Sequence, residues 1–530
     1  MSSTAVLSNR STRSHETVNP WIIAIAVMLG TFMEVLDTTV VNVALPHIAG
    51  SLSSTEDEAT WVLTSYLVSN AIILPMTGWL ANHFGRKRIL LMSVIGFTIS
   101  SLACGLAPTL GTLIIFRIIQ GATGGGLQPL SQAIMMEAFP PEKRGKAMAF
   151  WALGIVVAPM LGPVLGGWLT DSYSWRWVFY INLPIGILAT VMAILFIFDP
   201  PYIKPSGEGV DYWGMGFLVV GMGALQILLD KGQQEDWFSS DFIRLACTLA
   251  VVGLTAFVVR ELMTEHPIVD LRALKNRSYA TGVFMMTVIG FALYGSTVLL
   301  PLWLQTLMGY PALQSGLALL PRGMGSFLFM PIVGIMTGIF DPRKLLASGL
   351  IVVGVSFYVL SNLNLQSGYW DIFWAQILQG AAMGLLFVPL STVTMDSIAK
   401  EKMGNASSIF NLMRNIGASI GIASVGTIYA RGTQSNTAIL GVNVNPYSSY
   451  AQQMVQGLSS AMHAAGSDAF TAVQRSYAAL FMMVQQQAAM LAFIKTFRIL
   501  CFLFFAMLPL LLIMRRPKHM DKNGGGAGVH

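Results

Sequence analysis

Long apolar segments recur along almost the whole of this chain. A helix needs about 20 mainly apolar residues to cross the hydrocarbon core of a bilayer. Fourteen runs of roughly this length are present, at residues 21–45, 59–81, 89–107, 110–133, 147–169, 177–197, 212–229, 243–262, 280–303, 314–338, 345–361, 372–395, 405–429 and 490–514. Only 11% of all residues are charged, against about 25% in an ordinary soluble domain. The sequence therefore predicts an all-α integral membrane protein with fourteen transmembrane helices.

Lysine and arginine are distributed unevenly between the loops that join these runs. If residues 1–20 form a cytoplasmic tail, most of the 31 basic residues lie on the cytoplasmic side. The few that lie in loops on the other side are Arg176, Lys231, Arg244, Arg431 and Arg475. Cytoplasmic loops of membrane proteins carry such an excess of positive charge. We therefore expect both termini in the cytoplasm, with residues 515–530 as a second tail.

The order of the runs predicts two six-helix halves, at residues 21–199 and 278–514. A linker at 200–277 carries two extra transmembrane helices between them. The second half includes a long external segment, residues 431–489, which is rich in Gln, Ser and Ala and whose second part has a helical pattern. This segment is long enough either to dock a partner or to cover the mouth of a cavity, and the sequence leaves both open.

Glu34 and Asp37 are the two acidic residues in the middle of a predicted span. Residues three apart share one face of a helix, and an ionisable group within a bilayer is costly and marks a function by default. Two neighbouring buried carboxylates resist double ionisation, which favours a role in proton coupling. The alternative is a structural hydrogen-bonded pair, or a salt bridge to a buried arginine.

Polar residues deep in other spans are candidate partners of these acids. Arg117, Arg322 and Arg414 either neutralise a carboxylate or cap backbone carbonyls, and the sequence does not decide between the two. We assign Arg117 to proton coupling with Asp37 and Glu34. The candidate substrate cavity is formed by Glu34, Gln120, Arg322, Gln379, Asn411 and Arg414.

The loop after the second run contains a glycine-rich basic turn. It extends from Gly78 to Arg88, and its candidate gating residues are Gly78, Gly85, Arg86 and Lys87. This turn resembles the signature loop of the major facilitator superfamily, although Asn82 stands where that family usually has Asp. In the fourth run, Arg117 to Gly121 is similar to the second motif of the superfamily, whose buried arginine is linked to proton transfer.

The fifth run carries small residues at every fourth position, namely Gly154, Ala158, Gly162 and Gly166. Small residues at this spacing let a neighbouring helix approach closely. Pro159 and Pro163 are expected to kink or soften the helix. The pattern, which ends in Gly167, resembles the motif of exporters in the superfamily. We predict that these glycines and prolines take part in gating.

Two further segments, residues 36–46 and 175–184, closely resemble the fourteen-span drug:proton antiporters, and among them the EmrB-type multidrug permeases. The resemblance implies a proton-coupled antiporter that exports apolar or amphipathic small molecules across the inner membrane by alternating access. The alternative on the same scaffold is a lipid or siderophore exporter. A periplasmic membrane-fusion adaptor and an outer-membrane channel are the implied partners.

Other classes of function find no support in the sequence. The chain has no metal-ligand spacing, nucleophile elbow or phosphate-binding loop, so we expect neither an enzyme nor a metal or cofactor site. No basic run carries the interleaved aromatics of a nucleic-acid surface. Membrane lipid, the transported compound and protons are the remaining expected partners.

Overall fold

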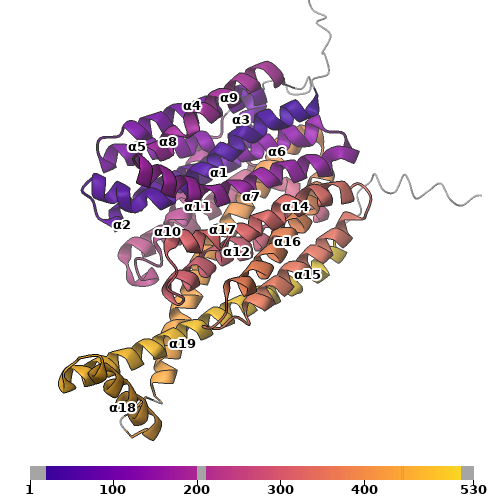
Figure 1. Cartoon of the computed structure of the whole chain (residues 1–530). Helices are drawn as coiled ribbons and strands as arrows, with labels where there is room; N and C mark the ends of the chain where they lie inside the picture. The colour runs from indigo at the N-terminus through magenta and orange to yellow at the C-terminus, as the bar shows by residue number, and fades with distance from the viewer. Residues whose placement is uncertain (1–18, 200–209, 443, 446, 515–530) are drawn as a thin grey trace, which may run out of the picture.

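The structure is a computed structural model, and it describes residues 19–199, 210–442, 444–445 and 447–514. All the regular elements within these residues are helices (Figure 1), which confirms the all-α prediction. The tail residues 1–18 and 515–530 and the first ten residues of the linker, 200–209, lie outside the described residues.

The first half forms six predicted spans, some of which are broken into two helices. Their bounds are α1 Pro20–Ser51, α2 Glu56–Ala59, α3 Trp61–Phe84, α4 Arg86–Leu106, α5 Leu110–Gly124, α6 Leu127–Ala138, η1 Pro141–Lys143, α7 Arg144–Ser172, α8 Trp177–Tyr180 and α9 Asn182–Phe196. The turn between α4 and α5 contains Pro108.

The linker and the second half follow with the same alternation of long helices and short turns. Their bounds are α10 Tyr212–Lys231, η2 Trp237–Ser239, α11 Asp241–Met263, η3 Leu271–Lys275, α12 Arg277–Thr306, α13 Ala312–Leu317, α14 Leu320–Met336, α15 Pro342–Leu360, α16 Tyr369–Asp396, η4 Lys400–Lys402, α17 Met403–Gly441, α18 Ser449–Ala464, α19 Ala469–Ala506 and η5 Leu508–Leu512.

Thirteen helical segments of the described chain are long and apolar enough to cross a membrane. The fourteenth predicted span is α17, whose 39 residues suffice in length but are less apolar. Buried polar residues such as Asn405, Asn411 and Arg414 lower its hydropathy. Because α17 packs against α3, α12 and α19 within the bundle, it completes the set of fourteen.

The helices form two groups that meet along one interface. In the first group α1 packs against α7 and α3 against α5, and in the second α12 packs against α17 and α14 against α16. The groups touch where α7 meets α14 and where α17 meets α3 and α6. The linker pair α10 and α11 pack on each other, and α10 also contacts α3. The pair therefore lies beside the bundle and is not part of its interior.

One end of the bundle carries both ends of the described chain, Asn19 and Met514, and we call it the termini end (Figure 1). The opposite end carries α18, and we call it the hairpin end. There the last part of α17, α18 and the first part of α19 project beyond the other helices (Figure 1). The predicted external segment 431–489 is thus mainly helical, and α17 and α19 extend into it.

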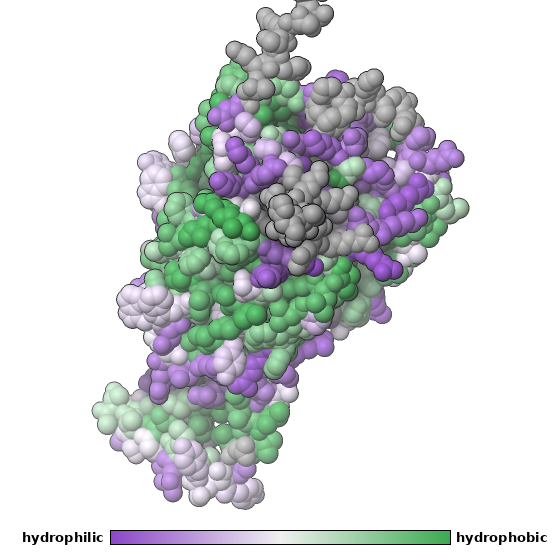
Figure 2. Space-filling view, turned by 90° about the vertical axis from the view of Figure 1, so that its right-hand side faces the viewer, coloured by the Kyte–Doolittle hydropathy of each residue, from purple (hydrophilic) through white to green (hydrophobic). Residues whose placement is uncertain are grey.

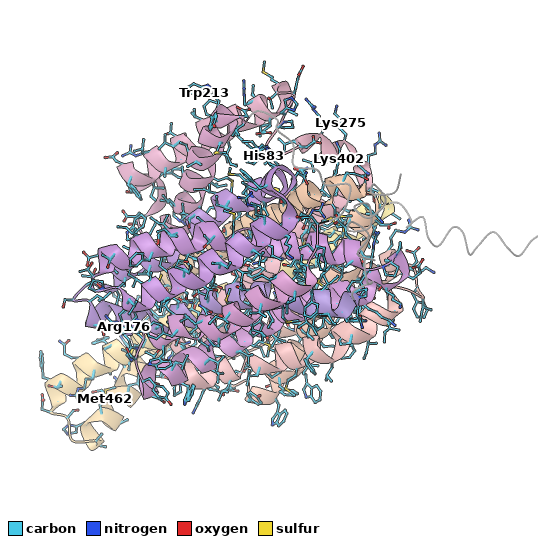
Figure 3. All side chains as sticks on the ribbon, turned by 90° about the horizontal axis from the view of Figure 1, so that it is seen from above. His83, Arg176, Trp213, Lys275, Lys402 and Met462 are labelled. Carbon is cyan, nitrogen blue, oxygen red and sulfur yellow. The ribbon has the colours of Figure 1, made fainter. Side chains whose placement is uncertain are left out.

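The surface of the bundle is divided in the way that a bilayer requires. Figure 2 shows apolar residues gathered in a broad belt, with polar residues above it. Large apolar side chains exposed on the helices include Ile99 of α4, Ile187 of α9 and Val252 of α11. Lys275 and Lys402 lie at one end of the bundle and Arg176 and Met462 toward the other (Figure 3). The chain is therefore a multi-pass membrane protein.

Candidate functional site

A buried ion pair joins two helices in the interior of the first half. Arg117 of α5 donates a hydrogen bond from Nη1 to Oδ2 of Asp37 of α1, at 2.5 Å. Both side chains are 0% exposed, so neither charge is screened by water. Such a pair is retained only with good geometry and further hydrogen bonds, because removing two charges from water is costly.

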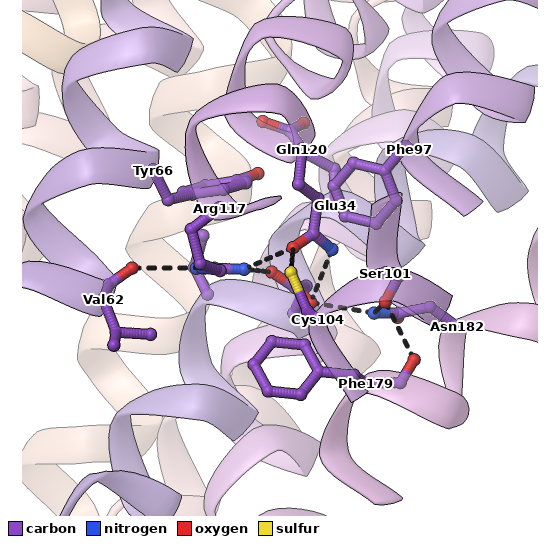
Figure 4. A network of polar contacts seen from close by, with 12 residues as sticks. Glu34, Val62, Tyr66, Phe97, Ser101, Cys104, Arg117, Gln120, Phe179 and Asn182 are labelled. Atoms are coloured by element: carbon purple, nitrogen blue, oxygen red, sulfur yellow. Dashed lines mark hydrogen bonds and ion pairs between the residues drawn. The ribbon is translucent and has the colours of Figure 1, made fainter. Parts of the chain in front are cut away.

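Two amides complete the coordination of the Asp37 carboxylate. Gln120 donates from Nε2 to Oδ1 at 3.1 Å, and Asn182 of α9 donates from Nδ2 to the same oxygen at 2.8 Å. Gln120 also accepts from Arg117 Nη1 at 2.8 Å. Figure 4 shows this network, in which side chains from α1, α5 and α9 converge on one point. Gln120, which we assigned to the substrate cavity, thus lies beside Asp37.

The rest of the Arg117 guanidinium is held by backbone and by an aromatic ring. Nε donates to the carbonyl oxygen of Val62 at 3.1 Å. The guanidinium carbon lies 4.1 Å from the centre of the Tyr66 ring, a distance at which a cation is attracted to the ring face. Nη2 has no hydrogen-bond partner within the described chain. Arg117 is therefore fixed mainly by α1 and α3, on either side of α5.

Glu34 lies on the same face of α1 as Asp37 but has different partners. Its Oε1 accepts from Nδ2 of Asn70 at 3.0 Å, and Oε2 has no hydrogen-bond partner among the described residues. Its carboxyl also neighbours Gln128 of α6 and lies within electrostatic reach of Arg414 of α17. Glu34 thus faces the interface between the halves, whereas Asp37 is enclosed within the first half.

Arg414 and Asn411 of α17 contact the first half through glutamine side chains. Arg414 donates to Oε1 of Gln128, and Asn411 donates to Oε1 of Gln132 at 2.6 Å. Both α17 residues are almost fully buried. No acidic side chain is bonded to Arg414 within the described residues. The two candidate cavity residues therefore form a polar contact between α6 and α17.

The remaining cavity candidates, Arg322 and Gln379, lie in the second half. Arg322 lines a cavity between the halves, together with Pro159 and Pro163 of α7. Gln379 is buried and donates to Oγ of Ser296 at 3.3 Å. The cavity residues assigned from the sequence thus lie in four places: around Glu34 and Asp37 on α1, at the α6–α17 contact, in the wall of the α7–α14 cavity and, for Gln379, beside Ser296 of α12.

The glycine-rich turn after α3 is anchored by two acids, one in α6 and one just after the end of α9. Arg86 forms a buried ion pair with Glu137 of α6. The backbone N–H of Lys87 donates to Oδ1 of Asp199 at 2.8 Å. Gly85 has a φ of +94°, a conformation that suits glycine and strains other residues. The turn therefore holds α3, α4 and α6 in one arrangement.

The glycines of α7 contact α1 at three of the four sequence-assigned positions. A Cβ atom at Gly162 would lie 2.1 Å from Oγ1 of Thr39, and one at Gly166 would lie 2.9 Å from the Val40 carbonyl oxygen. At Gly154 the neighbour is Cε of Met28. At Gly167 nothing lies within 4 Å, so it takes no part in this contact. The spacing of four thus does bring α7 and α1 together.

Comparison with known proteins explains this arrangement. Residues 27–422 match the family model described as Major Facilitator Superfamily. The chain belongs to the major facilitator superfamily. The multidrug export protein EmrB of Haemophilus influenzae is 40% identical over 81% of this chain and 84% of its own. The protein of the same name from Escherichia coli K12 is 37% identical over 96% of this chain and 98% of its own.

Solved structures of the superfamily share the fold at much lower identity. The human organic anion transporter MFSD10 aligns with a TM-score of 0.58 and 14% identity, covering 93% of this chain and 99% of its own. The proton:xylose symporter XylE aligns with a TM-score of 0.53 and 18% identity, covering 78% and 89%. These likenesses show the fold, with its two helical halves.

Within this superfamily member, sequence reasoning missed three residues that the structure brings to the site. Asn182 bonds Asp37, Tyr66 stacks on Arg117, and Glu137 pairs with Arg86. Asn182 lies in segment 175–184, which resembles the drug:proton antiporters, and an amide within an apolar run indicates a polar contact there. Glu137 falls between the predicted spans 110–133 and 147–169, where a solvated carboxylate is the ordinary expectation.

Proposed function

We propose that this chain is a proton-driven exporter of apolar or amphipathic small molecules in the inner membrane, working by alternating access. The observation that carries the proposal is the Asp37–Arg117 ion pair, which is fully enclosed within a membrane-spanning bundle. Ionisable residues at such depth mark ion pathways and proton relays. No other fully buried ion pair lies in the middle of a span among the described residues.

The pair supplies a way to couple a proton to a change of shape. In the arrangement seen here, Arg117 and two amides stabilise the charged carboxylate of Asp37. A conformation that withdraws Arg117 leaves that carboxylate in a low-dielectric site, where the neutral, protonated form is favoured. Because Arg117 is bonded to α3 through Val62, movement of α3 relative to α1 changes the distance between the two charges. Proton binding and helix movement are then linked.

The relatives support export of drug-like compounds. Besides the EmrB proteins, the fatty acid resistance protein FarB of Neisseria gonorrhoeae is 37% identical over 83% of this chain and 86% of its own. The names of these relatives concern multidrug export and resistance to fatty acids. None of these three names favours the siderophore alternative.

The contacts between the halves support a state closed at the termini end. There Arg144 of α7 pairs with Asp396 of α16 at 3.2 Å, and Ser407 of α17 donates to Gln132 of α6 at 2.8 Å. The excess of lysine and arginine in the loops assigned to this end supports a cytoplasmic position for it. We therefore infer that the site in this conformation is closed to the cytoplasm.

The projecting hairpin supports a partner on the opposite side. Large apolar side chains are exposed there, among them Tyr447, Phe470 and Phe481. An exposed apolar surface outside a bilayer marks a site of interaction. We propose that the hairpin end docks a periplasmic adaptor that leads to an outer-membrane channel. The competing proposal is that it covers the mouth of the outer cavity.

Proteoliposomes with an imposed proton gradient test the transport proposal. Wild-type protein is expected to move a fluorescent amphipathic compound only when the gradient is present. Asp37→Asn should abolish gradient-driven movement while leaving binding of the compound within about threefold. The matched control is Asp241→Asn, which removes an acid that is 95% exposed at the start of α11. Transport at a normal rate by Asp37→Asn would reject Asp37 as the proton carrier.

Deletion of residues 442–468 separates the two proposals for the hairpin. If the hairpin docks an adaptor, the deletion should abolish drug resistance in cells and leave exchange in proteoliposomes near normal. Loss of exchange in proteoliposomes would instead support the lid. Protein abundance in the membrane, measured in the same cells, controls for failed insertion.

A further inference from the structure

An apolar cavity lies between the two halves, and no residue of the Asp37–Arg117 cluster lines it. It encloses about 770 Å³ of empty space, including its opening. Met160 and Pro159 of α7 form one wall, and Tyr294, Met383 and Phe387 of α12 and α16 form the other. Arg322 is the one charged residue in the lining, and no acidic residue lines it. The cavity is therefore a largely apolar space with a single positive charge.

The Arg322 guanidinium has no partner within the described chain. It forms no hydrogen bond, ion pair or ring contact among the described residues, in contrast with Arg86, Arg117 and Arg414, which each bond a carboxylate or an amide. The side chain is partly buried in the cavity wall. A charge that has lost part of its water and has no partner is destabilised. A bound anion would offset that loss.

Arg322 lies beside a break in the predicted tenth span. α13 ends at Leu317 and α14 begins at Leu320, and Leu319 and Leu320 both line the cavity. The backbone N–H groups of Leu319 and Arg322 are bonded to the carbonyl oxygens of Gly316 and Leu319, and Pro321 has no N–H. The positive charge at the cavity wall is therefore that of the Arg322 guanidinium.

The backbone that carries Arg322 is fixed from behind by α16. A Cβ atom at Gly380 would lie 1.8 Å from the Arg322 carbonyl oxygen, so only glycine permits this approach. Ser326 donates to that oxygen at 3.1 Å and is within 3.0 Å of the Gly380 carbonyl oxygen. The guanidinium is thus presented to the cavity by a rigid support. Rigid presentation lowers the entropy lost when a ligand binds.

We propose that this cavity binds amphipathic organic anions. The carboxylate or similar head group pairs with the Arg322 guanidinium, and the apolar body lies against Met160, Tyr294 and Phe387. A guanidinium matches a carboxylate with two parallel hydrogen bonds, and the apolar walls contribute through burial. The inference rests on the proposed export function, because it names the class of compound that this site takes. A free organic anion and an anionic lipid share this chemistry.

Binding of a matched series of probes tests the proposal. The full-length protein is placed in nanodiscs of phosphatidylcholine, and fluorescence measures the affinity for pyrenebutyrate, pyrenebutanol and pyrenebutyl-trimethylammonium. The three probes share one apolar body and differ in charge. Wild-type protein should bind the anion at least about tenfold more tightly than the alcohol, and the cation most weakly.

Variants at Arg322 separate charge from packing. Arg322→Gln should weaken binding of pyrenebutyrate about tenfold or more and change binding of pyrenebutanol less than about threefold. Arg322→Lys, which keeps the charge, should retain most of the preference for the anion. Retained binding of the neutral probe shows that the variant is folded. The control is Arg244→Gln, at an exposed arginine paired with Asp241.

Equal binding of the three probes by wild-type protein, or unchanged affinity for the anion in Arg322→Gln, would overturn the proposal. Nanodiscs that contain phosphatidylglycerol distinguish the two sources of the anion. If the lipid displaces pyrenebutyrate from wild-type protein, the natural occupant is a lipid; if it does not, the occupant is a free anion. Either result leaves the anion site intact.

The proposed export function and the proposed anion site can be tested separately. Binding in nanodiscs needs no proton gradient, so Asp37→Asn should keep its affinity for pyrenebutyrate while losing export. Normal anion binding by wild-type protein without gradient-driven export would reject proton coupling and leave the anion site standing.

Discussion

Gly78 at the end of α3 and Asn405 at the start of α17 meet across the interface between the two halves, and no side chain fits between them. A Cβ atom at Gly78 would lie 2.6 Å from both Cα and the backbone nitrogen of Asn405. Asn405 in turn accepts from the backbone N–H of Asp270 at 3.0 Å, so the segment after the linker pair is tied to the same point. The termini end is thus closed through backbone contact.

Gly78→Val is expected to hold the halves apart at the termini end and to slow transport at least about tenfold. The obstacle is backbone, which cannot move aside as a flexible side chain does. Initial rates of gradient-driven transport in proteoliposomes measure the effect, and probe binding should stay within about threefold. Gly167→Ala is the matched control, because nothing lies within 4 Å of a Cβ atom there. Equal rates for wild type and Gly78→Val would show that this contact is not formed during transport.

Substitution of two glycines of α7 should have unequal effects on stability. Gly166→Ala places a methyl group 2.9 Å from the Val40 carbonyl oxygen, whereas Gly154→Ala meets the flexible end of Met28. We expect Gly166→Ala to cost about 1–3 kcal/mol through overpacking and Gly154→Ala less than about 1 kcal/mol. Thermal unfolding of the detergent-solubilised protein compares them. The reverse order would mean that α1 and α7 do not pack in this register.

Asn182→Leu should weaken proton coupling without abolishing it. The change removes the 2.8 Å hydrogen bond to Asp37 and leaves the bonds from Arg117 and Gln120. A hydrogen bond to a charged group contributes about 1.5–3 kcal/mol, and its loss makes the charged carboxylate less stable. Gradient-driven export in proteoliposomes should therefore slow about tenfold. The control is Asn362→Leu, at an exposed asparagine between α15 and α16. A rate equal to that of the wild type would show that this hydrogen bond does not contribute to coupling.

Glu137→Gln is expected to destabilise the protein by about 3–5 kcal/mol, because it leaves the buried charge of Arg86 without a partner of opposite charge. The double variant Arg86→Met, Glu137→Met removes both charges and should be less damaging than Glu137→Gln alone. Unfolding of the single and double variants forms the comparison. Additive losses would contradict direct pairing, which shows as a coupling between the two changes.

Labelling from one side of the membrane checks the proposed orientation. With Cys104, Cys247 and Cys501 replaced, single cysteines at Lys402 and Gln452 should react from opposite sides, Gln452 from the periplasm. The two positions lie at the termini end and in α18 of the hairpin. Labelling of both from the same side would refute the fourteen-span topology.

The sequence by itself determined the membrane class, the fourteen spans and the acid on α1, and the reason is local. A bilayer selects apolar residues over each length of about 20, so every span is visible in its own segment, and a carboxylate within one is conspicuous. α17 is the least apolar span, and the sequence still indicates it, because the loops alternate between the two sides of the membrane only if a span lies there. The glycine spacing of α7 likewise predicted a close helix contact, and α1 occupies that contact.

The tertiary structure alone decided which partner each polar group has. Arg117, Arg322 and Arg414 look alike in the sequence, yet the first pairs with Asp37, the third bonds Gln128, and the second has no partner in the described chain. These differences depend on distances between helices that lie far apart along the chain, such as the 80 residues between Asp37 and Arg117. Hydropathy and spacing describe one helix at a time, and the packing of helices against each other sets those distances.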